Sequence, residues 1–139
     1  MSWAERLLFL ECLLALAGAR LARTCLPFRV IASGMGTATQ EGGGQATAKQ
    51  VRIAREVGRA VETMAKYTPF ESNCLIKALA AQGMLRRRGI PRTIYFGVAR
   101  DAEQPFSAHA WLECGQCLIT GEKEHANFKV VARFTGSHL

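Results

Sequence analysis

The sequence predicts an α+β fold, in which N-terminal helices are followed by a small antiparallel sheet. Before residue 89 the apolar residues recur at helical spacing, whereas after it apolar and polar residues alternate as they do in strands. A chain of 139 residues is one domain by length, long enough for a single core. Helices first and strands second is the order expected of an α+β domain.

The first helix is expected over residues 3–24, and Pro27 ends it. One stripe at helical spacing is formed by Leu7, Leu10, Leu14 and Ala17, and other faces carry Leu8, Leu13 and Leu16. Such a helix needs cover on more than one side. We therefore expect it to pack on the domain, or to dock onto a partner or a membrane surface.

This segment is expected to be neither a membrane span nor a signal peptide. The apolar run of residues 7–19 is too short to cross a bilayer, and Glu11 interrupts it. Glu5 and Arg6 precede the run without the net positive charge that a signal peptide requires. The expected location is the cytoplasm, with membrane association through the N-terminal helix left open.

A Gly-rich linker is expected over residues 33–46. This stretch contains Gly42-Gly43-Gly44 and few residues that could bury apolar area, so we expect it to be mobile over residues 33–45. The predicted organisation is therefore an N-terminal apolar helix in residues 1–32, the linker, and a main domain in residues 47–139.

The second helix is expected from about Thr47 to Tyr67. Thr47 and Gln50 have the spacing of a capping box, which marks a helix start. One apolar stripe on this helix contains Val51, Ala54, Val57, Val61 and Met64. Four cations lie away from the stripe and are expected to face solvent, with an acidic partner as the alternative: Arg52, Arg55, Arg59 and Lys66.

The third helix is expected to end near Arg86–Arg88, where cations meet the negative end of the helix dipole, with Gly89 in the C′ position. Its start has two interpretations. A cap at Thr68 would put Cys74 inside the second turn. A start at residues 72–73 would instead put the Cys74 thiol in the positive field of the helix N-terminus. The sequence alone does not decide between them.

Strands follow the third helix. The turn residues Gly115-Gln116 predict a two-residue hairpin between two of them. The expected strands are Arg92–Ala99, Ala108–Cys114, Cys117–Thr120 and Phe128–Phe134.

The charge and the cysteines limit the possible partners and the compartment. A net charge of +7 favours acidic partners, but no block of Lys and Arg interleaved with aromatics is present, so nucleic acid is not an expected partner. Five cysteines are an odd number, and their spacing is not that of a disulfide scaffold. A reducing, cytosolic setting fits this pattern better.

Cys74 and His109 are the candidate catalytic residues. A cysteine attacks as the thiolate, which a helix N-terminus and a neighbouring imidazole both stabilise, and the imidazole then protonates the leaving amine. Cys74 lies near the expected start of a helix, and His109 lies in the first half of an expected strand. The two residues can be distant in sequence because the fold brings them together.

A second cysteine motif, Cys114-Gly115-Gln116-Cys117, flanks the expected hairpin turn. A structural zinc site would need two further ligands, and no second spaced pair supplies them. We therefore expect two cross-strand thiols here, with no metal and no other cofactor.

Three blocks of the sequence carry a family resemblance. They are S-N-C-L-I-K-A-L at residues 72–79, L-R-R-R-G-I-P at 85–91 and A-H-A-W-L-E at 108–113. In this order and spacing they resemble the transglutaminase-like cysteine leader peptidases of lasso peptide biosynthesis. The apolar N-terminal helix ending in L-P-F-R at 26–29 is also similar. The resemblance covers nearly the whole chain apart from the linker and implies a papain/transglutaminase-like fold.

The resemblance implies an activity and partners. Cys74 would be the nucleophile and His109 the general base and then acid, in hydrolysis of the leader from a ribosomally made precursor peptide. A separate leader-recognition protein and an asparagine-synthetase-like macrolactam cyclase are the implied partners. The alternatives are an acyl-transferring enzyme of the same fold and a non-catalytic peptide-binding relative.

The sequence departs from the family at the third catalytic residue. Where the Asp or Asn that orients the imidazole is expected, the chain reads Thr120-Gly121-Glu122. Glu122 is the best remaining carboxylate, ahead of Glu124 and Asn127, although a role as a turn residue fits it equally well. The catalytic set is therefore a pair with an uncertain third member.

Two further residues are candidates for contact with the substrate. Trp111 shares the His109 face of its strand by period two, and it fits either the cleft or the core. Asn73 precedes the nucleophile, where it would donate to an oxyanion or cap the helix.

Overall fold

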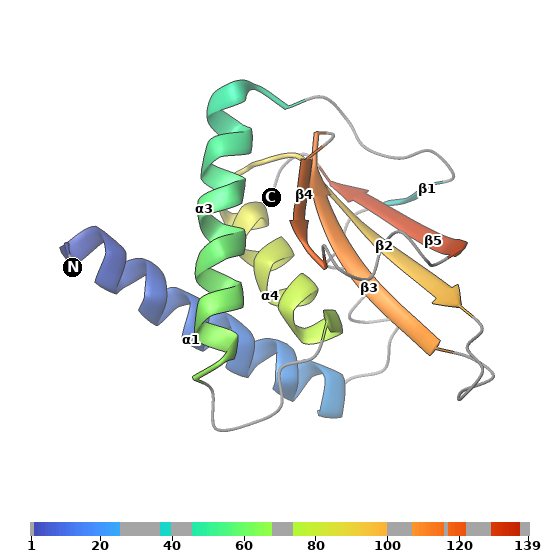
Figure 1. Ribbon diagram of the computed structural model, residues 1–139, viewed down its shortest axis with the longest axis horizontal. Coiled ribbons are helices and arrows are strands. Elements are labelled where there is room, and N and C mark those ends of the chain that lie inside the picture. The colour runs from blue at the N-terminus through green and yellow to red at the C-terminus, as the bar shows by residue number, and fades with distance from the viewer. Residues whose placement is uncertain are drawn as a thin grey trace.

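The computed structural model describes residues 2–25, 37–39, 46–67, 74–99, 107–115, 117–121 and 129–136. Within these residues, three helices lie to one side of a five-stranded sheet in which every pairing is antiparallel, as Figure 1 shows. Helices α3 and α4 contact the sheet, and α1 packs on α3 and α4. The predicted α+β fold is confirmed.

Helix α1 (Trp3–Cys25) buries only one of its apolar faces. Cys12 and Leu16 are fully buried against the rest of the domain, whereas Leu7, Leu10 and Leu14 are exposed. The predicted helix is confirmed, but the cover expected on a second side is not found within the described residues. Among these residues, no helix combines the length and the apolar composition needed to span a bilayer.

Helix α3 (Ala48–Ala65) has the predicted capping box. The Gln50 N–H donates to Thr47 Oγ1 at 3.1 Å, and the Thr47 N–H donates to Gln50 Oε1 at 2.9 Å. Two of the four backbone amides that have no carbonyl partner at the helix N-terminus thereby gain a side-chain acceptor. The middle of the predicted apolar stripe is buried, as Ala54, Val57 and Val61 show.

Helix α4 (Cys74–Arg87) begins at the candidate nucleophile. The choice between the two predicted starts depends on residues 68–73, which lie outside the described residues. At the other end, Gly89 has φ of 66° and the Ile90 N–H donates to the Leu85 carbonyl at 3.0 Å. A residue without a Cβ adopts this left-handed conformation readily, so the predicted glycine C-cap is confirmed.

Glu11 joins α1 to the end of α4. Its carboxylate accepts from Arg88 at 2.6 Å and 2.8 Å and from Arg87 at 2.5 Å. Hydrogen bonding from Arg88 is the main cause that holds the pKa of Glu11 below its ordinary value of 4.5. A lowered folded-state pKa means that this contact stabilises the fold above pH 4.5, and that the stabilisation is lost as the pH falls through the folded-state pKa.

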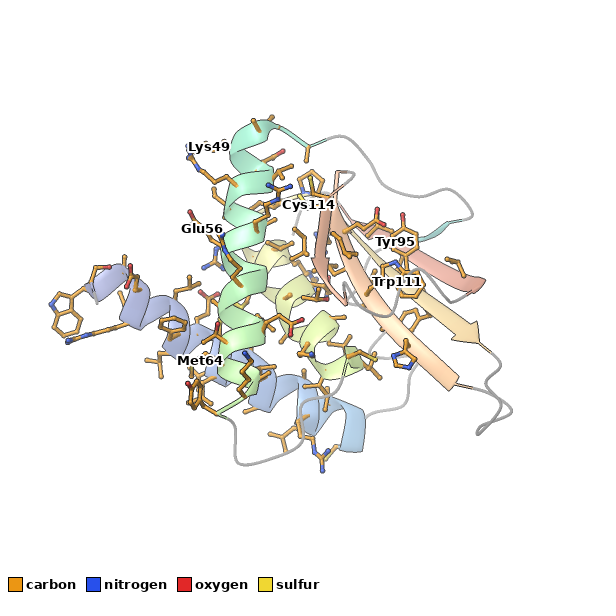
Figure 2. The ribbon with its side chains drawn as sticks, in the orientation of Figure 1. Lys49, Glu56, Met64, Tyr95, Trp111 and Cys114 are labelled. Carbon is orange, nitrogen blue, oxygen red and sulfur yellow. The ribbon has the colours of Figure 1, made fainter. Side chains whose placement is uncertain are left out.

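We expect Glu11→Gln to lower the free energy of unfolding by about 0.5–1 kcal/mol at neutral pH, the range of a partly exposed ion pair. The difference from wild type should shrink below pH 4.5. Urea unfolding at neutral pH and at about pH 3 measures both effects. Glu56→Gln, at an exposed position on α3 (Figure 2), is the matched control and should change little. An equal loss in both variants would contradict the role of the Glu11 contact.

The sheet has the strand order β1-β5-β2-β3-β4. The strands are β1 (Thr37–Thr39), β2 (Arg92–Ala99), β3 (Ser107–Cys114), β4 (Cys117–Thr120) and β5 (Lys129–Gly136). The last four match the expected strands to within two residues at each end. The hairpin turn expected between β3 and β4 is also present, because Cys114 pairs with Cys117 across it.

Strand β1 lies within the expected Gly-rich linker, where the sequence predicted no strand. Thr37, Ala38 and Thr39 pair with residues 133–135 of β5 at the edge of the sheet. Main-chain hydrogen bonds to an open edge need no apolar side chain, which explains why the sequence pattern gave no sign of a strand. Of the remaining linker, residues 33–36 and 40–45 lie outside the described residues.

The core lies between the helices and the sheet. Its largest fully buried side chains come from α1, α3, α4, β2 and β3, and include Leu16, Val61, Ile76, Met84, Leu85, Ile94 and Leu112. Each helix therefore contributes at least one buried apolar side chain to the same core, and α1 is part of the domain.

Candidate functional site

Cys74 and His109 lie in contact at one end of the domain. The Sγ atom of Cys74 is 3.5 Å from Nδ1 of His109, although the residues are 35 positions apart in the sequence. Both side chains are partly buried, so each keeps some access to solvent. The structure therefore brings together the two residues that the sequence singled out.

Two elements position the pair. Cys74 is the first residue of α4, which packs on β2 and β3. His109 lies near the start of β3 and is held in register opposite Gly97 of β2. On its other side, β3 pairs with β4 through Leu112, Glu113 and Cys114 within the described strands. The thiol at the helix start meets the imidazole at this end of the sheet.

The arrangement suits thiolate chemistry. Cys74 is the first described residue of α4, and the positive end of the helix dipole, which lies at this end of α4, stabilises an anion. Nδ1 of His109 lies where it can take the thiol proton. The Cys74 sulfur thus has both usual means of activation close to it.

Four of the predicted candidates lie outside the described residues. They are Asn73, Glu122, Glu124 and Asn127.

Trp111 stacks on Tyr95 of the neighbouring strand, with ring centroids 5.7 Å apart and an interplanar angle of 8°. Figure 2 shows the two labelled side chains lying together on β2 and β3. Only 3% of Trp111 is exposed, which favours packing over substrate contact as its role. The stacked pair supports the part of β3 that follows His109.

Gly121 is a residue that the sequence reasoning did not single out as part of the site. A Cβ at this position would lie 2.6 Å from the Trp111 Cβ and 3.1 Å from the Ala110 carbonyl oxygen, and its φ is 83°. Only glycine fits both the close approach and the left-handed backbone. The chain that leaves β4 therefore lies directly on β3, at the two residues that follow His109. A glycine at a strand end is the signal that could have indicated this approach.

The second cysteine motif forms the predicted cross-strand pair. Cys114 is buried and Cys117 partly buried, and both are free thiols. Burial is the main cause that raises the pKa of Cys114 to about 11, so this thiol stays protonated at neutral pH. Arg55 donates to the Cys117 sulfur at 3.4 Å. No group of three or more metal-ligating side chains occurs in the part of the chain that the structure describes.

Comparison with known proteins assigns the family. A family model described as the transglutaminase-like superfamily matches residues 13–133, a range that contains both Cys74 and His109. No curated protein and no solved structure matches the chain. Members of this superfamily commonly use a catalytic cysteine. Because the match extends over most of the sequence, the chain belongs to the transglutaminase-like superfamily.

Proposed function

We propose that this protein is a cysteine peptidase that removes the leader from a ribosomally made lasso precursor peptide. The observation that carries the proposal is the 3.5 Å contact between Cys74 Sγ and His109 Nδ1 at the start of α4. Superfamily membership supports the coarser statement, a papain-like cysteine peptidase or transferase. The finer assignment is supported by the sequence blocks around residues 72–79, 85–91 and 108–113.

The proposed reaction has two steps. In the first, His109 Nδ1 takes the proton of Cys74, the thiolate attacks the scissile carbonyl carbon, and the proton passes to the leaving amine as the peptide bond breaks. In the second, water attacks the thioester while His109 takes a proton from it, and the thiol is regenerated as the carboxylic acid leaves. The bond formed to sulfur is thus broken again, and one water molecule is consumed.

Glu122 is the proposed orienting residue. With Nδ1 facing the thiol, the other ring nitrogen of His109 is left to donate to an acceptor that fixes the ring. The close approach of Gly121 to Ala110 and Trp111 supports this choice, because Glu122 is the next residue along the chain. Asn73 is proposed to donate to the oxyanion beside the Cys74 amide.

The proposed setting follows from the same family resemblance. The substrate is the precursor peptide, a separate protein presents its leader, and an asparagine-synthetase-like cyclase closes the macrolactam on the freed core. The reaction is proposed to take place in the cytoplasm and to need no metal.

The test is cleavage of a leader–core precursor by the purified protein together with the leader-recognition protein. We expect mass spectrometry to find two products that are separated at the leader–core junction. A scrambled peptide of the same composition is the control and should stay intact. An uncut precursor in the complete mixture would overturn the peptidase assignment.

Superfamily membership also allows acyl transfer, so the same assay should be run with a primary amine added. Hydrolysis gives a leader with a free carboxylate, whereas transfer gives a leader amide. We expect the free carboxylate to dominate, because water completes the proposed second step. A product that is mainly the amide would favour the transferase instead.

A further inference from the structure

The exposed side of α1 carries a regular apolar stripe. Its large members are 53–75% exposed and are Trp3, Leu7, Leu10, Leu14 and Leu21. With the partly buried Ala17 they follow each other at intervals of 4, 3, 4, 3 and 4 residues. This alternation is the heptad spacing of the a and d positions in a coiled coil. We call these six residues the α1 seam.

The α1 seam is not the face by which the helix packs on its own domain. That face lies on the opposite side and is formed by Leu8, Phe9, Cys12, Ala15, Leu16 and Ala19. It contacts α3 and α4. Figure 1 shows that the N-terminal turns of α1 extend beyond the other two helices. The helix therefore has two apolar faces, and in the described structure only one of them is covered.

The shape of the α1 seam favours a helix over a bilayer as its occupant. A helix that lies in a membrane surface has a wide apolar face, whereas a stripe of a and d positions alone is the narrow seam of helix pairing. The positions that border the stripe are Arg6, Leu13 and Arg20 on one side and Ala4, Glu11 and Gly18 on the other, so Leu13 is the single large apolar residue among them. From Trp3 to Leu21 the seam is about 27 Å long at 1.5 Å per residue, enough for more than two heptads.

The charges beside the α1 seam indicate the chemistry of that helix. Glu11 is already bound by Arg87 and Arg88, whose guanidinium groups thus lie on the same border. Arg6, on the other border, stacks over the Trp3 ring at 5.4 Å. Arg6, Arg20, Arg87 and Arg88 are four cations beside the seam, against the one carboxylate of Glu11, so the borders are positive. In a parallel pair with a second copy, Arg6 would face the cluster of Glu11, Arg87 and Arg88, whose net charge is positive, whereas a helix with acidic borders would complement both sides.

We propose that the α1 seam is a docking site for a helix of another protein, one with apolar residues at heptad spacing and carboxylates beside them. The paired helices would bury the exposed leucines, and carboxylates of the partner would face Arg6, Arg87 and Arg88. This docking site does not depend on the peptidase activity, because it is assigned from α1 and the end of α4 alone.

The test uses a designed peptide of about three heptads, with Leu at a and d and Glu at e and g. We expect it to bind the full-length protein in fluorescence anisotropy, more weakly as salt rises. Leu10→Glu and Leu14→Glu should each weaken binding at least about tenfold. Ala48→Glu, which adds the same charge at the exposed start of α3, is the matched control and should leave binding unchanged. Circular dichroism checks that each variant is folded.

Three results would overturn the proposal. The first is no binding of the Glu-bordered peptide, or equal binding of a peptide with Lys at e and g. The second is that the protein binds vesicles containing anionic lipid more tightly than it binds the peptide, and that the same leucine substitutions weaken the vesicle binding. The third is a dimer in sedimentation analysis that those substitutions dissociate. None of these measurements uses substrate turnover, so failure here is distinct from failure of the proposed function.

Discussion

Replacing Cys74 by alanine should abolish turnover of the precursor and leave the protein folded. The sulfur is the proposed nucleophile, and loss of a nucleophile in a comparable catalytic set costs at least about 10⁴-fold in rate. Cys74 is partly buried at a helix start, so loss of its one heavy atom should change stability by less than about 1 kcal/mol. Product formation by mass spectrometry and thermal unfolding by circular dichroism measure the two effects.

The matched control is Cys25→Ala. Cys25 is an exposed free thiol at the end of α1, so its loss should leave turnover at the wild-type rate. His109→Ala should lower the rate of turnover nearly as much as Cys74→Ala does. The double variant should lower the rate no further, because a thiol and its base act as one unit. A Cys74→Ala protein that cleaves as fast as wild type would remove the basis of the proposed function.

The sequence was most informative where one face of an element is buried. The apolar stripe of α3, its Thr47 cap and the alternation in β2 all predicted the elements that the structure contains. These signals are strong because a helix or strand that buries one face must repeat apolar residues at its own period. The glycine after α4 is equally direct, because the left-handed backbone at Gly89 favours a residue without a Cβ.

Elements that depend on tertiary pairing could not be predicted in this way. Strand β1 has three small residues and exists through its pairing with β5. The sequence likewise could not predict which apolar face of α1 is exposed. Both faces are apolar, and only the position of α3 and α4 decides which one is buried.

The site itself was predicted in part. Its two residues were identified by chemistry and by resemblance, but their contact is a property of how α4 packs on β3. The period of two predicted which face of its strand Trp111 lies on. It could not predict that the Tyr95 ring of the neighbouring strand stacks on the Trp111 side chain. The close approach at Gly121 likewise required the backbone positions of two strands.

Gly58→Ala should destabilise the protein by about 2 kcal/mol, which for a domain of this size lowers the melting temperature by about 8 °C. A Cβ at this buried position would lie 2.5 Å from the Ile119 carbonyl oxygen and 2.7 Å from its Cγ2 atom. Because the first of these atoms is backbone, α3 and β4 would have to move apart. Alanine is the better helix former by about 1 kcal/mol, so a net loss isolates the steric effect.

Gly18→Ala and Gly83→Ala make the same chemical change in α1 and α4. No atom lies within 4 Å of a Cβ at either position, so both variants should gain about 0.5–1 kcal/mol from helix propensity. If the free energy of unfolding falls in Gly58→Ala but rises in the other two variants, Gly58 is required for the contact between α3 and β4. That contact also holds β4, from which the chain continues to Gly121 beside the histidine strand. If Gly58→Ala stabilised the protein like the other two, the close packing of α3 on β4 would be wrong.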